Sequence, residues 1–149
     1  MKIIKKFAVA MLCISAFQAS ANDCELTIES NDMMQFSKKS LSVPEKCKEV
    51  KLTLIHTGKL PATVMGHNWV LTEKKNVKAV ASDGMRAGVK SSYVKPNDPR
   101  VFAFTSVIGG GESTSITFST NGMNKNTEYN FFCSFPGHFA IMKGTFNIV

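Results

Sequence analysis

The chain has 149 residues, of which 44% are hydrophobic, and a formal net charge of +7 at pH 7. Its lysines are scattered, and the sequence has no Lys/Arg-rich cluster with interleaved aromatic residues, so we do not expect nucleic acid as a partner. The length is that of a single domain, and the sequence contains no internal repeat, linker or second domain.

The first 21 residues have the three parts of a secretory signal peptide. The stretch MKIIKK is basic, residues 7–17 are apolar, and small residues precede the expected cleavage point after Ala21. The apolar part is shorter than the roughly 20 residues that span a bilayer, so we expect no membrane anchor. Cleavage leaves residues 22–149 as one exported domain. Three of the 18 Lys and Arg residues and none of the 11 acidic residues lie in the leader, so this domain carries a net charge of +4.

Short segments in which apolar and polar residues alternate dominate the rest of the chain. A period of two is typical of strands with one buried face, and turn signals at residues 57–58, 109–111 and 121–122 separate the segments. The pattern predicts an all-β sandwich or barrel of seven or eight strands. In chain order, the clearest segments are residues 24–29, 50–56, 67–71, 101–108, 115–119, 128–133 and 143–149.

One region between the third and fourth of these segments has a different period. Its apolar and small residues recur at helical spacing, which predicts a helix with one apolar face that ends near Gly88. Residues 91–100, which include two prolines, are expected to form a loop. The residues that define the helical face are Val77, Val80, Ala81, Gly84 and Met85.

The cysteines leave one thiol without an obvious partner. Cys13 departs with the leader, and Cys24, Cys47 and Cys133 remain. In an oxidising compartment thiols pair, and a bridge from Cys24 to Cys47 could close a loop of about two dozen residues, stabilising the fold by roughly 3 kcal/mol. Cys133 is then unpaired, so we expect it to be buried, used in chemistry or bound to a metal.

The stretch CSFPGHFAIM places three soft or borderline donors, Cys133, His138 and Met142, in an otherwise apolar loop. Each one alone has an ordinary explanation, because a buried Cys or Met usually fills a core and a lone His is usually hydrogen-bonded. Together, in an exported chain with one unpaired cysteine, they favour a metal site. A further ligand must come from elsewhere. We favour His67, which follows Gly66, and expect His56 to be a core histidine.

Two imidazoles, a thiolate and a thioether form the ligand set of blue-copper electron-transfer sites. The stretch offers no carboxylate to act as a base and no open coordination position, which a catalytic metal requires. We therefore expect electron transfer rather than enzyme activity. Two alternatives remain open, a periplasmic copper storage or delivery protein and a zinc-stabilised module.

These residues resemble the azurins, bacterial periplasmic proteins of the cupredoxin family. The likeness covers essentially all of residues 22–149 and includes the Cys24/Cys47 pair, the helical insertion and the long Cys-x4-His-x3-Met loop, together with the stretches MGHNWVL, SDGM, FFCSFPGH and MKGT. The resemblance implies a cupredoxin-like Greek-key fold, a periplasmic location, a monomer and one type 1 copper ion.

The resemblance also implies roles for single residues. His67, Cys133 and His138 would be the equatorial ligands, with Met142 as a weak axial ligand and the Gly66 carbonyl opposite it. In the same comparison, Asn68 would tie the two ligand loops together, and the backbone amides of Asn68 and Phe135 would donate to the Cys133 sulfur.

A final implication concerns partners. Azurin-like proteins exchange electrons through a flat apolar patch around the second histidine, with redox proteins such as c-type cytochromes, nitrite reductase or amine dehydrogenase. Exposed apolar loop residues are typical of such docking surfaces. In this chain the patch would consist of Met34, Leu60, Met65, Met85, Phe135, Pro136 and Ala140.

Overall fold

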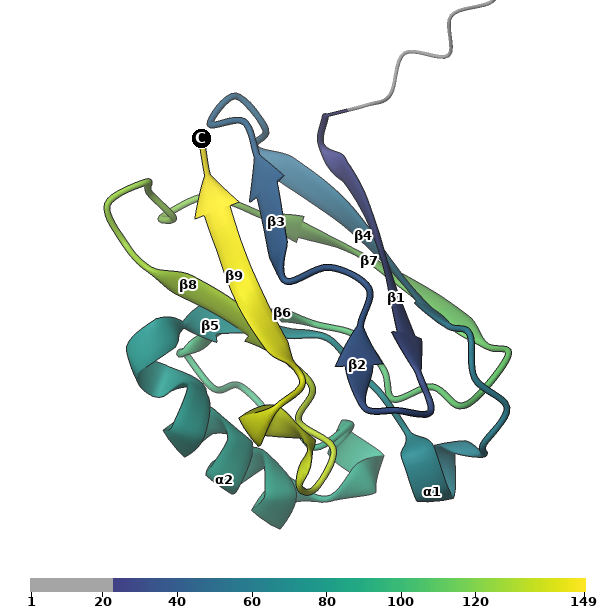
Figure 1. Ribbon diagram of the computed structural model, residues 1–149. Helices are drawn as coiled ribbons and strands as arrows, with labels where there is room; N and C mark the ends of the chain where they lie inside the picture. Colours follow the sequence, from purple (N-terminus) through teal and green to yellow (C-terminus); the bar gives the residue numbers. More distant parts are fainter. Residues whose placement is uncertain (1–22) are drawn as a thin grey trace, which may run out of the picture.

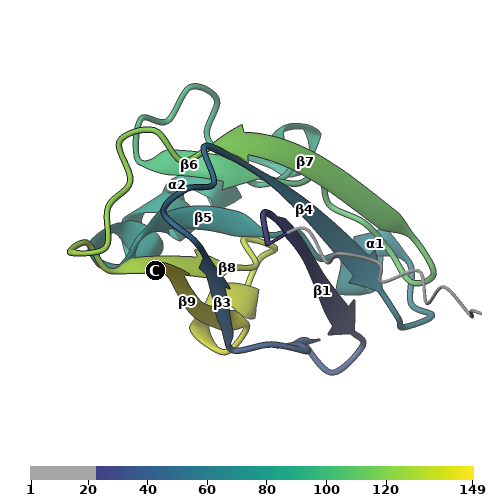
Figure 2. The same cartoon turned by 90° about the horizontal axis from the view of Figure 1, so that it is seen from above.

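Two β-sheets face each other in the computed structural model, which describes residues 23–149 (Figure 1). The predicted leader therefore lies outside the described residues. The first sheet has the order β2-β1-β4-β7 and the second has the order β3-β9-β8-β5-β6. Seen from above, the sheets form the two walls of a sandwich (Figure 2).

The strands of the first sheet are β1 (Glu25–Asn31), β2 (Gln35–Phe36), β4 (Glu49–His56) and β7 (Ser113–Ser119). Those of the second are β3 (Ser40–Val43), β5 (Val70–Glu73), β6 (Val101–Phe104), β8 (Tyr129–Phe132) and β9 (Lys143–Ile148).

The predicted alternation places the core between the sheets. In β4, Val50, Leu52 and Leu54 are fully buried, whereas Lys51 between them is exposed. The Trp69 ring is fully buried in the core. Its centroid lies 5.8 Å from that of the Phe118 ring and 5.9 Å from that of the Phe131 ring. The sandwich class predicted from the sequence is thus confirmed.

The described residues contain nine strands, including β2 and β3, for which the sequence yielded no clear segment. β2 has only two residues, too few for alternation to be visible, and β3 pairs in parallel with the distant β9. The predicted strand 101–108 is shorter in the structure, because the chain leaves the sheet after Phe104. It returns only at Ile108, which forms an isolated bridge with His67.

The predicted helix is α2 (Val77–Ala87), which covers the outer face of the second sheet (Figure 1). Val80 and Ala81 of α2 pack against Val70 of β5 and Phe132 of β8. β5 is therefore buried on both faces. The helix ends at Gly88, whose φ of 78° favours glycine. Short helical turns occur at α1 (Ala62–Met65), η1 (Lys74–Asn76), η2 (Val89–Ser91) and η3 (His138–Ala140).

The two early cysteines form the predicted disulfide. Cys24, just before β1, and Cys47, just before β4, have Cα atoms 5.6 Å apart. Cys133 is the free cysteine among the described residues, and it is buried. No helix in residues 23–149 is long and apolar enough to cross a membrane.

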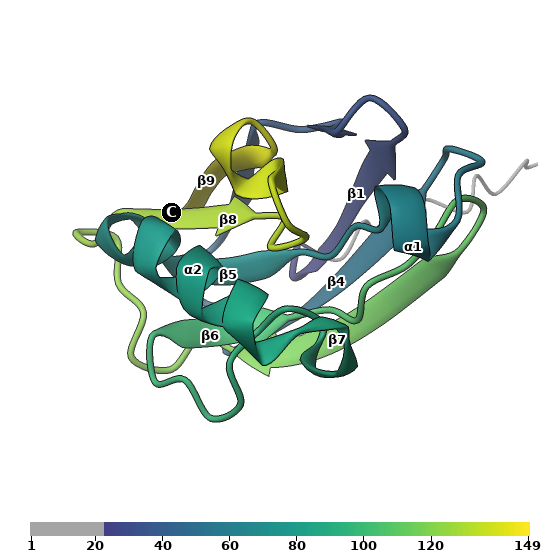
Figure 3. The ribbon, with the colours of Figure 1, turned by 90° about the horizontal axis from the view of Figure 1, so that it is seen from below.

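One end of the sandwich carries most of the irregular structure. Figure 1 places α1, η3, the turn between β1 and β2 and the end of α2 at its lower end, and Figure 3 shows the same segments from below. Both of the predicted ligand-bearing stretches, 66–68 and 133–142, lie between strands at this end.

Candidate metal centre

Three buried side chains from distant parts of the chain converge at this end. The sulfur of Cys133 lies 3.7 Å from Nδ1 of His67 and 3.6 Å from Nδ1 of His138. The three donor atoms are all within 4.8 Å of one another. Among the His, Cys, Asp and Glu side chains of the described residues, these three form the group that could hold a metal ion. Two imidazoles and a thiol in a buried site fit a soft or borderline transition metal such as copper.

His67 is held with its lone pair toward the cysteine. Its backbone exchanges two hydrogen bonds with Ile108, at 3.0 and 2.9 Å. On the ring, Nε2 lies 2.8 Å from the carbonyl oxygen of Asn31. A carbonyl can only accept, so Nε2 carries the proton and Nδ1 is free to bind a metal. Burial lowers the pKa of His67 to about 4, which keeps the ring neutral at pH 7.

The loop that carries the other donors is closed by backbone hydrogen bonds. The N–H of Cys133 donates to the carbonyl of Met142 at 3.0 Å, and the N–H of Met142 donates to the carbonyl of His138 at 2.8 Å. Gly137 turns the chain with a φ of 86°. Cys133, His138 and Met142 are therefore brought to one place by local geometry.

The thiol of Cys133 is protected from ionisation until a metal binds. Burial raises its pKa to about 12, while the backbone N–H groups of Asn68 and Phe135, which donate to the sulfur, act in the opposite direction. A coordinating thiol must lose its proton. With a metal bound, the two amides would stabilise the thiolate and lower its electron donation.

Asn68 joins the two ligand stretches. Its side chain is fully buried; Oδ1 accepts from the N–H of Ser134 at 2.8 Å, and Nδ2 donates to Oγ of Ser134 at 2.8 Å. Nδ2 also donates to the carbonyl of Ser92 at 2.7 Å. Both amide hydrogens are thus used, which fixes the side chain between His67 and Cys133.

Comparison with known proteins agrees with this geometry. The model of copper-binding proteins of the plastocyanin/azurin family matches residues 22–149. The chain belongs to the plastocyanin/azurin family of copper-binding proteins.

Named relatives of the chain are azurins. It is 54% identical over 125 residues to an azurin of Alcaligenes faecalis, covering 84% of this chain and 98% of that protein. An azurin of Pseudomonas aeruginosa is 42% identical over 144 residues, 97% of each chain. The solved structure of an azurin, Az-iso2 from the obligate methylotroph Methylomonas sp. strain J, superimposes with a TM-score of 0.83 at 45% identity, covering 86% of this chain and 99% of that one. The protein is therefore a copper-binding electron-transfer protein with a cupredoxin fold, not an enzyme.

The other two predicted ligands, the Gly66 carbonyl and Met142, belong to the same two stretches as the three donors. The Gly66 carbonyl oxygen is 4.0 Å from the Cys133 sulfur. Gly66 has no room for a side chain, because a Cβ would meet the carbonyl of Ala62 and the ring of Phe135. Met142 is fully buried at the end of the ligand loop.

His56 is close to the azurin-like site but turned away from it. Its ring stacks on that of His67 with centroids 4.6 Å apart. Nε2 lies 2.9 Å from the carbonyl of Met65, and Nδ1 accepts from the N–H of Gly58 at 3.0 Å. Both ring nitrogens are satisfied by backbone groups, as expected of a core histidine.

The sequence did not reveal the groups that hydrogen-bond to His67 and Asn68 and so hold the ligand stretches in place. Asn31 and Ser92 act through backbone carbonyls, which every residue has, so their side chains carry no signal. Ser134 is recognisable only by its position next to Cys133.

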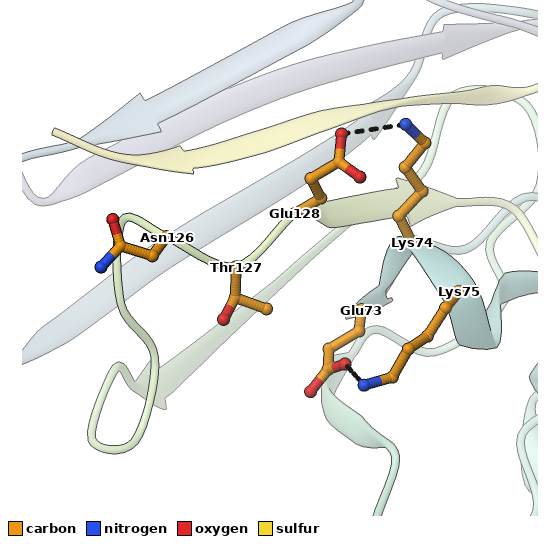
Figure 4. A pocket seen from close by; sticks show the side chains of 6 residues that line it. All are labelled: Glu73, Lys74, Lys75, Asn126, Thr127 and Glu128. Atoms are coloured by element: carbon orange, nitrogen blue, oxygen red, sulfur yellow. Dashed lines mark hydrogen bonds and ion pairs between the residues drawn. The ribbon is translucent and has the colours of Figure 1, made fainter.

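A hollow on the surface lies away from the site. Figure 4 shows its lining, with Lys74 paired to Glu128 at 2.9 Å and Lys75 paired to Glu73 at 2.5 Å. It lies at the start of β8, whereas Cys133 follows the end of that strand. The lysines and Glu128 are more than half exposed, so we interpret the hollow as solvated surface.

Proposed function

We propose that this protein carries single electrons between redox proteins of the periplasm. In this proposal His67, Cys133 and His138 would hold one copper ion, with Met142 and the Gly66 carbonyl as weak further ligands. Thiolate and thioether suit Cu(I), and imidazole suits both oxidation states. A bound copper ion supplies the one-electron couple, and the buried, hydrogen-bonded ligands limit how far the site rearranges when the charge changes.

The observation that carries the proposal is the convergence of two imidazole nitrogens and one thiol sulfur within 4.8 Å of one another in a buried site. No acidic side chain belongs to this group, which weakens the case for hydrolytic chemistry. The periplasmic location is supported by the basic, apolar and small-residue parts of residues 1–21, which we propose are removed before Asn22.

An absorption spectrum tests the proposal. Protein loaded with Cu(II) should be intensely blue through charge transfer from the Cys133 sulfur, and Cys133→Ser should lose the colour and keep the fold. The control is the double variant Cys24→Ala/Cys47→Ala, which removes the other two cysteines of the domain, those of the disulfide, and should stay blue. A blue Cys133→Ser protein would refute the ligand set. Wild-type protein that carries zinc when isolated would support a structural module, and rapid release of copper to a chelator would support delivery.

The apolar patch predicted around His138 is our proposed electron port. Leu60 and Met85 are 39% and 44% exposed, Pro136 and Ala140 are exposed, and Met34, Met65 and Phe135 are half-buried. Their segments meet at the lower end of the sandwich (Figures 1 and 3). The same segments carry four further exposed apolar side chains, Met33, Val64, Val89 and Ile141.

Exposed apolar side chains gathered at one end of the sandwich fit weak, short-lived docking. Partners with a matching apolar surface would include c-type cytochromes, a nitrite reductase or an amine dehydrogenase.

A charge placed in the patch tests its role. Met65→Lys should slow electron self-exchange by more than tenfold, because two copies would have to bury like charges against each other. The visible spectrum should barely change. Val149→Lys adds the same charge at the C-terminus, at the opposite end of the sandwich (Figure 1), where 67% of the Val149 side chain is exposed. Equal exchange rates in the two variants would place the port elsewhere.

A further inference from the structure

The segment that follows α2, residues 88–94, is held in an unusual conformation, and we call it the strap. Ser92 and Tyr93 have φ angles of 53° and 52°, in the left-handed region that non-glycine residues rarely occupy. Such a conformation persists only where its surroundings impose it. Here the N–H groups of Ser92 and Tyr93 donate to the carbonyls of Val89 and Gly88, at 2.8 and 3.0 Å.

The strap reaches the metal centre at two points. Its first contact is the Ser92 carbonyl, which accepts from Nδ2 of Asn68 at 2.7 Å. Because a carbonyl cannot donate, this contact decides which end of the Asn68 amide faces which neighbour. Oδ1 must then face the N–H of Ser134, the residue that follows Cys133.

The second contact is aromatic. The Tyr93 ring meets the Phe135 ring edge-on, with centroids 5.4 Å apart and planes at 74°. Phe135 in turn lies against His138, with centroids 4.7 Å apart. The strap thus reaches Cys133 through Asn68 and reaches His138 through Phe135.

The helix α2 supports the strap from the other side. The Tyr93 carbonyl packs against Gly84, where an added Cβ would collide with the carbonyl oxygen. Val94 is buried against Val80 and Ala81 of α2. Farther along the loop, Arg100 pairs with Asp83 of α2 at 2.5 Å, so α2 holds the loop at both ends.

We propose that the strap is a positioning element of the copper site. Through Gly84 and Tyr93, α2 places the Ser92 carbonyl where it orients Asn68 and so holds the backbone N–H of Asn68 against the Cys133 sulfur. This inference rests on the proposed role of Cys133 as a ligand. If the strap moves, the hydrogen bond to the sulfur weakens and the thiolate donates more strongly. A stronger donor would favour Cu(II) over Cu(I), so the reduction potential would fall. Hydrogen bonding around the cysteine sulfur is known to tune the potential of such sites in this way.

The main test is Gly84→Ala, measured against Ala79→Gly. Ala79 is exposed on the same helix, so Ala79→Gly weakens α2 through propensity without touching the strap. We expect Gly84→Ala to lower the reduction potential, shifting the equilibrium with a fixed mediator by at least threefold, or about 28 mV. Ala79→Gly should lower stability and leave the potential unchanged. If the two variants have the same potential, the proposal is wrong.

A second pair decides the matter if Gly84→Ala does not fold. Tyr93→Leu removes the aromatic edge from Phe135, and Tyr93→Phe keeps it. The potential should change in the first and match wild type in the second. Two variants that both match wild type would overturn the proposal.

A metal-free measurement separates this inference from the proposed function. In protein without copper, the side-chain amide of Asn68 should exchange its hydrogens at least tenfold faster in Gly84→Ala than in Ala79→Gly. That result would support the strap even if the wild-type protein were not blue. Equal exchange rates would contradict the strap while leaving the copper function intact.

Discussion

At the residue scale, Met142 offers the sharpest test of the ligand set. A thioether is a weak donor, and Cu(II) gains more than Cu(I) from any added donor. Met142→Leu keeps this fully buried position apolar and removes the sulfur. The reduction potential should therefore rise by about 60 mV, a tenfold change in the equilibrium constant of a one-electron couple. Voltammetry of the copper-loaded variant measures this shift.

The control for that measurement is Met123→Leu. Met123 is a half-buried methionine that packs against the same core but follows β7, outside the ligand loops, so its replacement should leave the potential unchanged. Both variants should still bind copper. A potential that falls in Met142→Leu would remove Met142 from the ligand set, and a loss of copper binding would contradict its role as a weak ligand.

At the scale of elements, the tether between α2 and the loop before β6 should make stability depend on pH. Arg100 pairs with Asp98 at 2.6 Å and with Asp83 of α2 at 2.5 Å. Hydrogen bonds from Arg100 hold the pKa of both carboxyls below the usual 3.8. A carboxyl with a lowered pKa stabilises the fold above its ordinary pKa, and this contribution is lost as pH falls through the lowered value. The free energy of unfolding should therefore decline below about pH 4.

Asp98→Asn measures the size of this effect. The Asp98 side chain is almost fully buried, so its charged hydrogen bonds should be worth about 1–3 kcal/mol at pH 7, and the variant should lose less stability on acidification. Urea unfolding at several pH values provides the comparison. Asp23→Asn, which breaks an exposed pair with Lys46, should behave like wild type. An Asp98→Asn protein with the wild-type acid profile would mean that the tether does not control acid stability.

At the scale of the whole molecule, copper should stabilise a domain that is already folded. The ligands are held by protein hydrogen bonds, such as those from His67 to Asn31 and from Cys133 to Met142. Removal of the metal should therefore leave the fold intact and lower the melting temperature. With free copper at 100 times its dissociation constant, the gain in stability is about 2.7 kcal/mol. Thermal unfolding with and without copper measures it.

Cys133→Ser is the matched variant for this experiment, because it should gain much less stability from copper than wild type does. Loss of native near-UV circular dichroism in metal-free wild-type protein would show that the metal builds the site, contrary to this prediction.

The local part of the site was accessible from the sequence alone. Cys133, His138 and Met142 lie within ten residues, and the turn at Gly137 brings this stretch back on itself. Alternation and helical spacing are likewise local properties, so the sandwich class and the end of α2 at Gly88 could be predicted. The strands β2 and β3 could not be predicted. β2 has only two residues and so shows no alternation, and β3 pairs with the distant β9, a contact that no local pattern in the sequence indicates.

The sequence favoured His67 over His56 as a ligand, but only the tertiary structure showed the physical difference between these two buried histidines. Their rings stack on each other, so His56 lies beside the site without belonging to it. They differ in what their ring nitrogens meet. His56 has backbone groups at both nitrogens, whereas His67 has a carbonyl at Nε2 and the Cys133 sulfur near Nδ1. The contacts that support the site, from the carbonyls of Asn31 and Ser92, are equally invisible in the sequence. A backbone carbonyl belongs to every residue, and only the folding of distant segments decides where it points.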